Sequence, residues 1–239
     1  NYITQLWEGY QRFKTDIDFK YEYYYALTKN QETIFDVYPG KSLQQIVGVI
    51  TKMNRVDSAM FKPYEKISKE IDLALEDYQV VMQLKYKGRS TLVRFYNDSR
   101  TLPDQQNMNA AFSRLLEDPI PNLYFVTGAL ERNIHKKGER EYFTHVLDKS
   151  NRYALINTGF DADSLNLSTQ PIPDSTFVLV MADPKMDLTP TVLNKLQTHI
   201  NTGGNMLVLG EPGKQYVLNP LLSQTGVQFS NGQLVEPSR

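Results

Sequence analysis

Short apolar runs that stop abruptly at turn residues constrain the fold of this chain most strongly. The first, 123–127, ends at Gly128, and two later runs, 177–181 and 206–209, lead into Asp-Pro and Gly-Glu-Pro-Gly sequences. Runs of this length without polar alternation indicate strands buried on both faces, each followed by a tight turn. In an open α/β sheet, the turns at the carboxyl ends of the strands are where ligands usually bind.

Amphipathic segments separate these runs and predict helices. Pro190 and the preceding Thr189 favour a helix over 189–201, because proline suits the first helical position and threonine is a good cap. Strands that alternate with such helices indicate an α/β domain at 105–239, with a mostly parallel sheet covered by helices on both faces. The other elements expected there are helices at 104–117, 137–149 and 219–222, strands at 153–157 and 227–229, and a loop at 159–175.

The first part of the chain predicts a smaller α+β domain at 1–98. Aromatic and charged residues alternate over 17–25, which predicts a half-buried strand with its aromatic side chains inward. A Lys-Gly turn within 78–96 predicts a hairpin, and the polar segment 97–106 is the expected linker to the second domain. Helices are expected at 2–13, at 42–56 with Ser42 as cap, and at 63–76 with Pro63 in the first turn.

Composition excludes several classes of function. Hydrophobic residues make up 41% of the chain, charged residues 22%, and the net charge is -1, so nothing indicates a nucleic-acid partner. The absence of cysteine excludes disulfides, thiolate nucleophiles and zinc–thiolate sites. No apolar stretch is long enough to span a bilayer. Because the chain starts at Asn1 without a methionine, we expect an excised piece whose targeting or membrane segments lie outside it.

Acidic residues follow the ends of three expected strands, at Glu131, Asp183 and Glu211. Because the carboxyl ends of parallel strands meet at one edge, we expect these carboxylates to point towards one crevice. There they would bind a cation or a cationic ligand, or form an acid/base pair. Alternatively, Asp183 and Glu211 cap turns and helix starts, since Asp-Pro and Glu-Pro are common in turns. The candidate ligand-binding residues are Thr127, Gly128, Glu131, Asp183, Glu211 and Gly213.

Catalytic motifs do not accompany these acids. The segment 210–214 resembles part of a phosphate loop, but Val208 and Gln215 stand where that motif needs glycine and Ser or Thr. A nucleophile elbow needs Ser or Cys at its apex, and Glu-Pro occupies that position here. The sequence contains no Gly-x-Ser-x-Gly, so a catalytic triad is not expected. We therefore predict no catalytic residue, no cofactor and no metal.

Histidines and a basic run offer further candidate groups. The three histidines lack the spacing of metal ligands, so packing or surface roles are expected for them. Arg132 and Arg140 flank the basic run 135–137 beside the turn at Gly128. Such a run would hold an anion, although a solvated loop is the more ordinary interpretation.

The segment 123–131, Leu-Tyr-Phe-Val-Thr-Gly-Ala-Leu-Glu, resembles the Tyr-Phe-Leu-Thr-Gly-His-Gly-Glu segment of the GldG-like family. Members of that family are extracytoplasmic parts of ABC-type transport components associated with bacterial gliding motility. The family usually has histidine where this chain has Ala129, so a site that uses this histidine does not carry over. Further segments that resemble the family are 105–116, 138–142, 173–184, 188–212 and 218–226, which extends the likeness over 105–235.

The resemblance implies an amidotransferase-like or flavodoxin-like sheet without a nucleophile, preceded by a thioredoxin-like domain without redox cysteines. It also implies a periplasmic domain of a bacterial inner-membrane protein, held by flanking transmembrane segments beside a permease and an ATPase. We therefore expect a non-enzymatic domain that binds a partner or ligand at the strand-end crevice. Two alternatives stay open: a hydrolase or transferase that uses Glu131 with Asp183 or Glu211, and a small-molecule or sugar sensor with an apolar, aromatic pocket.

Overall fold

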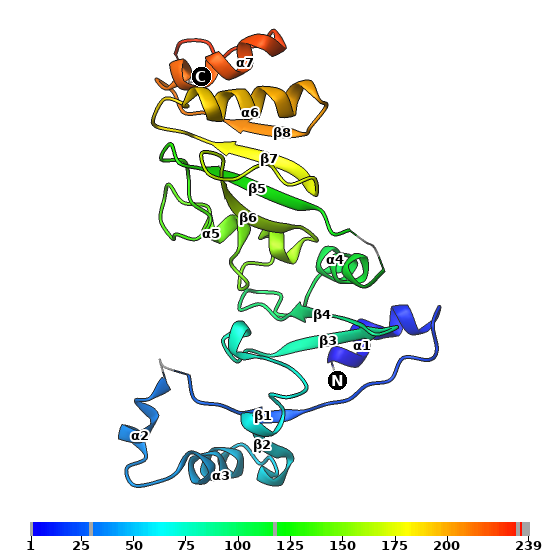
Figure 1. The fold of residues 1–239 in the computed structure, drawn as a ribbon. Helices are drawn as coiled ribbons and strands as arrows, with labels where there is room; N and C mark the ends of the chain where they lie inside the picture. The colour runs from blue at the N-terminus through cyan, green and yellow to red at the C-terminus, as the bar shows by residue number, and fades with distance from the viewer. Residues whose placement is uncertain (1, 29–30, 117–118, 233–234, 236–239) are drawn as a thin grey trace. The chain divides into compact units, whose positions relative to one another are not determined.

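The computed structural model describes residues 2–28, 31–116, 119–232 and 235. The chain forms two compact units, 1–79 and 80–239 (Figure 1). This division falls before the hairpin, whereas the sequence suggested a boundary at 97–106. Across the described ranges, no helix has the length and apolar character needed to cross a membrane.

The regular structure of the N-terminal unit, within the described residues, is a small parallel sheet and three helices. β1 and β2 pair in parallel, with Tyr24 opposite Lys62. The predicted cap of α3 is confirmed, because Ser42 Oγ accepts a hydrogen bond from Gln45 N while the Gln45 side chain accepts one from Ser42 N. The elements are α1 (Tyr2–Gln11), β1 (Tyr23–Tyr25), α2 (Ile34–Val37), α3 (Leu43–Met53) and β2 (Phe61–Pro63), with 3-10 turns at Ser58–Met60, Tyr64–Lys66 and Ala74–Glu76.

The strand predicted over 17–25 is largely wrong. Only Tyr23–Tyr25 forms a strand, and Phe19, Tyr21 and Tyr23 are exposed rather than inward. Tyr24 takes the inward direction instead, and its hydroxyl donates a hydrogen bond to the Tyr78 carbonyl oxygen at 2.7 Å. Aromatic residues occur on both faces of this segment, so alternation along the sequence cannot show which face is inward. The pairing of β1 with the short β2 decides it.

The helix predicted over 63–76 is also wrong. Pro63 ends β2, and two 3-10 turns follow it. The Tyr64 hydroxyl accepts a hydrogen bond from Leu73 N at 2.8 Å, and the Tyr64 ring packs edge-on against Tyr78 at 4.9 Å. Ile67 and Leu73 are the buried apolar side chains, a spacing that does not fit one face of an α-helix.

The predicted hairpin opens the C-terminal unit. β3 (Val81–Tyr86) and β4 (Arg89–Arg94) pair antiparallel around Lys87 and Gly88, whose φ angles are 47° and 80°. Two consecutive positive φ angles are the geometry of a turn that matches strand twist, and glycine adopts them without strain. The hairpin packs against α4 (Gln105–Leu116), which buries Met108 and Ala111. The predicted end of this helix at 117 lies outside the described residues.

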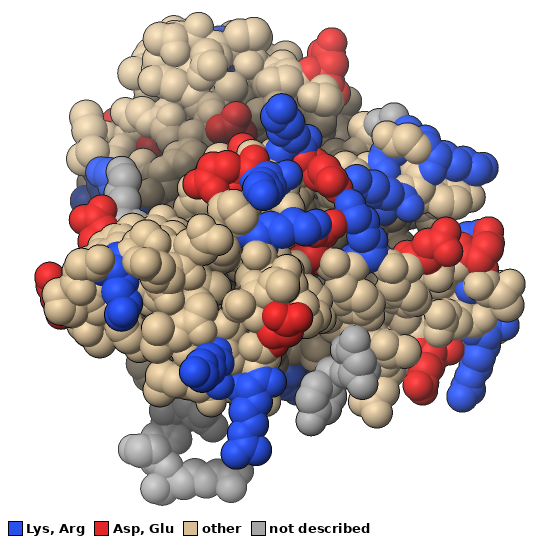
Figure 2. Space-filling model, turned by 90° about the horizontal axis from the view of Figure 1, so that it is seen from below, with Lys and Arg blue, Asp and Glu red and all other residues tan. Residues whose placement is uncertain are grey.

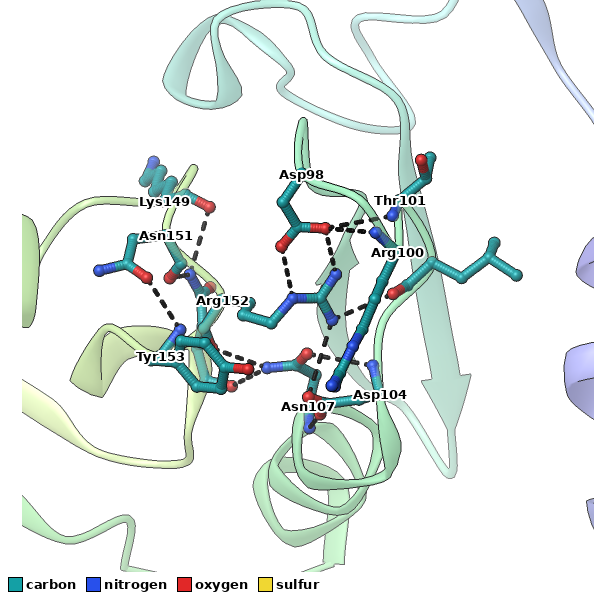
Figure 3. A network of polar contacts seen from close by, with 11 residues as sticks. Asp98, Arg100, Thr101, Asp104, Asn107, Lys149, Asn151, Arg152 and Tyr153 are labelled. Carbon is teal, nitrogen blue, oxygen red and sulfur yellow. Dashed lines mark hydrogen bonds and ion pairs between the residues drawn. The ribbon is translucent and has the colours of Figure 1, made fainter.

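Arg152 joins the segment after the hairpin to the rest of the C-terminal unit (Figure 3). Its side chain is 2% exposed, and Nε and Nη2 bond the two carboxylate oxygens of Asp98 at 2.6 and 2.7 Å. Nη1 donates to the Leu102 carbonyl oxygen at 3.1 Å, and the guanidinium lies 4.6 Å from the centre of the Tyr96 ring. The polar segment 97–106 is therefore tied into this unit.

A second layer of polar contacts supports this arginine. Asn107 of α4 donates from Nδ2 to the carbonyl oxygens of Arg152 and Asn157, at 3.0 and 3.1 Å. The Asn157 side chain accepts from Arg94 Nη1 at 2.7 Å and donates to the Asn151 carbonyl oxygen at 2.8 Å. The hairpin, α4 and the 151–157 loop thus form one connected network.

A four-stranded parallel sheet forms the centre of the C-terminal unit and confirms the predicted α/β architecture. Its strand order is β6-β5-β7-β8 (Figure 1). α6 and α7 cover one face over Val126, Leu179 and Met181, whereas α5 and the loops beside it cover the other over Phe125 and Val180. The elements are β5 (Asn122–Thr127), α5 (Phe143–Val146), β6 (Asp161–Asn166), β7 (Thr176–Ala182), α6 (Pro190–Asn201), β8 (Met206–Leu209) and α7 (Gln215–Leu222).

The strand order creates a switch point between β5 and β7. From β5 the chain goes to β6 on one side, and it then returns past β5 to β7 on the other. Connections that leave two neighbouring strands in opposite directions open a crevice at the carboxyl ends of those strands. The residues that follow β5 and β7 are therefore the ones that this topology places at a binding edge.

Several predicted elements of this unit are corrected. β6 lies inside the predicted loop 159–175, and the predicted strand at 153–157 is a 3-10 turn, Leu155–Asn157. The helix expected over 137–149 is reduced to α5, with Gly138 at φ 150°. No strand forms at 227–229, where the Asn219 side chain accepts from Phe229 N at 2.8 Å and donates to its carbonyl oxygen at 3.1 Å. By contrast, the Thr189 cap of α6 is confirmed.

Candidate binding site at the carboxyl edge of the parallel sheet

Backbone hydrogen bonds join the loops at the carboxyl edge of the sheet. Lys185 N donates to the Ala129 carbonyl oxygen at 2.8 Å, and Arg132 N donates to the Ala182 carbonyl oxygen at 2.9 Å. Asp183 N donates to the Leu209 carbonyl oxygen at 2.8 Å, which continues the pairing of β7 with β8 by one residue. The side chains that follow β5 and β7 are thus carried by backbone that these bonds hold in place.

Asp183 is the buried acid of this edge. Its side chain is 3% exposed, and its backbone has a φ of 53°. Aspartate tolerates this left-handed conformation better than most residues, because its short side chain bonds locally. A buried carboxylate needs charged or hydrogen-bonding partners, since desolvation of an unpaired charge is very unfavourable.

Three cationic side chains supply these partners. Arg140 Nη2 lies 2.6 Å from Asp183 Oδ2, Lys185 Nζ lies 2.7 Å from Asp183 Oδ1, and Arg132 Nε lies 3.5 Å from Oδ2. The same cations also reach Glu211, in direct contacts from Arg132 and Lys185 and at 3.5 Å from Arg140 Nε. We call these five residues the edge cluster, and it carries one positive charge in excess.

Electrostatics in the edge cluster follow this geometry. Hydrogen bonding with the Asp183 carboxyl and with the Lys185 ammonium lowers the pKa of Glu211 to about 2. The bond to Asp183 also raises the pKa of Arg140. Arg132 lies over the Tyr142 ring at 5.5 Å, which holds this guanidinium from a second side.

Glu131 has a different environment from the other two predicted acids. Its Oε2 accepts a hydrogen bond from Ala129 N at 2.8 Å, so the carboxylate caps the turn after β5. Burial raises the pKa of Glu131, and the bonds from backbone N–H groups oppose that shift in part. The structure thus brings Asp183 and Glu211 together through shared cations and assigns Glu131 to its own turn.

The other predicted residues have backbone roles. Thr127 ends β5 opposite Asn166. Gly128 has a φ of 127°, and a Cβ there would lie 3.5 Å from the Asn166 side-chain oxygen. Gly213 has a φ of 81° and faces open space. These residues shape the edge rather than supply charged groups to it.

Sequence reasoning missed most of the cationic half of the edge cluster. Arg132 and Arg140 were recognised as part of a basic run, but a solvated loop was preferred, and Lys185 was not singled out. The available signal was the lysine two residues after Asp183, together with two arginines in the loop that follows β5. A cation site is no longer favoured at this edge, and none of the described residues form a group of three or more His, Asp or Glu side chains suited to a metal ion.

A cavity of about 500 Å³ lies at the opposite, amino-terminal edge of the sheet. Its walls include Gln106, Asn109 and Ser113 of α4, together with Pro121 and Phe160. Arg114 also lines it but is engaged, with Nη1 at 2.7 Å from Asp161 Oδ1 and Nη2 donating to the Phe160 carbonyl oxygen at 2.8 Å. These walls mix polar and apolar side chains with a single aromatic ring, and they lie at the other edge from the aromatic pocket that a sensor would need.

On the face drawn in Figure 2, basic and acidic side chains lie interspersed. Comparison of the chain with protein-family models, with curated proteins and with solved structures gives no match. The function must therefore be inferred from the chemistry of the edge cluster and from the fold that holds it.

Proposed function

We propose that this chain is a non-catalytic, extracytoplasmic domain of an ABC-type transport system component, and that it binds a partner or ligand at the carboxyl edge of its parallel sheet. The observation that carries the proposal is the pairing of Asp183 and Glu211 with three cations. A general acid or base must exchange a proton near the working pH. Two carboxylates held in ion pairs do not meet that requirement, whereas a preorganised charged edge at a switch point suits binding.

The strand order of the parallel sheet supports a flavodoxin-like fold for the second domain. The order β6-β5-β7-β8 is the 2-1-3-4 pattern of flavodoxin-like sheets, with β5 as the first strand. An amidotransferase-like or flavodoxin-like sheet without a nucleophile is therefore our proposal for 105–239. A thioredoxin-like fold for 1–98, the GldG-like family, and the permease and ATPase partners in a bacterial inner membrane are proposed from the sequence resemblance alone.

Site-specific photocrosslinking in native membranes tests this proposal. A photoreactive residue would replace Lys136, which is exposed in the loop between Arg132 and Arg140, and a control would replace the exposed Asn109 on the opposite edge of the sheet. We expect the residue at 136 to crosslink to the permease subunit, identified by mass spectrometry, and the residue at 109 not to do so. Equal crosslinking from both positions, or none from 136, would contradict the proposal.

A carboxylate-based hydrolase or transferase is the second candidate, and one observation favours it. Burial raises the pKa of Glu131, while hydrogen bonding with Asp183 and Lys185 lowers that of Glu211. Acids whose pKa values are pushed apart are suited to acid/base chemistry. Turnover of ester or glycoside substrates by the purified chain, abolished in Glu131→Gln, would establish this candidate. We expect no difference between the two proteins.

A further inference from the structure

We propose that Glu211 occupies a carboxylate-binding site from within the chain, and that an external ligand carboxylate binds to the edge cluster by taking the place of Glu211. This inference rests on the proposal that the carboxyl edge is a binding surface, and it names the chemical class of the ligand. The anion is bound, not transformed, and the step requires only that the 210–213 turn moves its side chain aside.

The contacts of Glu211 define the shape of the site. Its Oε1 contacts Arg132 Nη2 and lies 3.5 Å from Arg140 Nε, while its Oε2 contacts Lys185 Nζ. The two oxygens of one planar carboxylate thus face separate cations. Guanidinium groups match this two-oxygen geometry, and hydrogen bonds between ionised partners are stronger than those between neutral groups.

The two acids of the cluster differ in how easily they could leave it. Asp183 is 3% exposed and its backbone is bonded into the sheet, so it is a fixed counter-ion. Glu211 is 32% exposed and lies in a turn with a glycine on either side, one of them Gly213 with a φ of 81°. Glu211 is therefore the displaceable acid.

Charge decides the class of ligand. Once Glu211 has moved away, Arg132, Arg140 and Lys185 face Asp183 alone, with two positive charges in excess. Arg132 and Lys185 have side chains that are 18% and 17% exposed, so water compensates them only in part. An anion fills that position and a cation is repelled, which agrees with the basic run 135–137 that the sequence places beside the turn at Gly128.

Glu211 also lowers the affinity of the edge cluster for an external carboxylate, because its own tethered carboxylate competes for the same cations. Groups held on a short flexible segment act at an effective concentration on the order of millimolar or more. Removing the tethered acid should therefore strengthen the binding of a free carboxylate by about tenfold.

Titration by NMR of the whole chain tests the proposal. Succinate is added to the wild type and to Glu211→Ala, and the backbone amides of 129–132 and 183–185 are followed. We expect saturable shifts of these amides in Glu211→Ala and about tenfold weaker binding in the wild type. Glu211→Gln, which keeps the side-chain size, should behave like Glu211→Ala and guards against a folding defect in either variant.

Two further arms identify the source of the carboxylate and the specificity of the site. Acetylated triglycine with a free C-terminus is compared with its amide, and inorganic phosphate is compared with succinate. Binding of the free acid but not of the amide would assign the site to peptide C-termini as well as small acids, and tighter binding of phosphate would overturn the carboxylate assignment. The matched control is Asp161→Ala, which frees one cation, Arg114, at the other edge of the sheet.

The proposal fails if both Glu211 variants are folded and succinate shifts neither set of amides. It also fails if Asp161→Ala gains succinate binding to the same extent, because a single freed cation would then suffice. Either result would leave the crosslinking experiment unaffected, since a partner could still contact this edge without a carboxylate. Conversely, succinate binding without crosslinking at 136 would retain the site and reject the transport assignment.

Discussion

Replacement of Arg152 by alanine should destabilise the C-terminal unit more than any other single change at a charged residue outside the edge cluster. Arg152 is 2% exposed and holds four partners at once: Asp98, the Leu102 carbonyl oxygen, the ring of Tyr96 and, at 3.7 Å, the Asp104 carboxylate (Figure 3). Hydrogen bonding to Arg152 lowers the pKa of Asp98, as expected for a carboxylate paired with a guanidinium. Removal of the guanidinium would therefore free the 97–106 segment from the 151–157 loop.

The size of the effect follows from these contacts. Asp98 is 41% exposed, so water would solvate its carboxylate in the mutant. The loss of the ion pair therefore adds nothing to the expected change in the free energy of unfolding. The mutation removes three contributions: the bond to the Leu102 carbonyl oxygen, the stacking on Tyr96 and the burial of the arginine stem. The side-chain entropy that alanine no longer loses on folding offsets them in part. Together they give about 3 kcal/mol for Arg152→Ala, or a fall in Tm of about 6–12 °C for a unit of this size. Arg152→Met keeps the stem and should regain about half of the loss.

Urea unfolding followed by circular dichroism, with hydrogen exchange of the two segments, measures this effect. The single tryptophan, Trp7, belongs to the N-terminal unit and does not report on Arg152 directly. Faster exchange should appear in 97–106 and 151–157. Arg100→Ala is the matched control, because it removes an exposed guanidinium from the same loop and should leave stability unchanged. A free energy of unfolding for Arg152→Ala within about 0.5 kcal/mol of the wild type would refute the reasoning.

Three further predictions concern pH and the turn after β5. The lowered pKa of Glu211, about 2 against 4.5, gives stabilisation that is complete above pH 4.5 and lost towards pH 2, so Glu211→Gln should flatten the urea-measured stability curve there. Burial raises the pKa of Tyr96 to about 12 from 10.0, so stability should fall between these pH values, and less so in Tyr96→Phe. Burial also raises the pKa of Glu131, because the charged carboxylate is disfavoured there. Glu131→Gln keeps an acceptor for Ala129 N without the charge, so its Tm at pH 7 should equal or exceed that of the wild type. Glu131→Ala removes the acceptor and should lower the Tm.

The elements that could be predicted from sequence are those whose signal is local and redundant. The strands ending near Thr127 and Ala182 are apolar runs without alternation, which only a doubly covered sheet accommodates. The starts of α3 and α6 were predicted because Ser42 and Thr189 satisfy free backbone N–H groups through their own side chains. Such interactions involve residues three or four apart, so they are visible in the sequence.

The elements that were missed depend on distant partners. β6 is an edge strand of largely polar sequence, and only Leu165 in it is buried, so its pairing with β5 decides its conformation. The helix expected over 63–76 has adequate periodicity, yet Tyr64 ties the backbone of Leu73 into a tighter path. In both cases tertiary contacts override a weak local preference.

The convergence of Asp183 and Glu211 was predictable, because parallel strands bring their carboxyl ends to one edge whatever loops follow. Their cations were not, because Arg140 and Lys185 reach Asp183 only through the paths of two loops. Stability alone does not account for this arrangement, since apolar side chains of similar volume usually serve a protein interior at least as well as buried ion pairs. What apolar side chains cannot provide is a fixed acid that holds three cations in position and a more exposed acid that is able to leave them. That difference between Asp183 and Glu211 is why we assign binding, rather than support of the sheet, to the edge cluster.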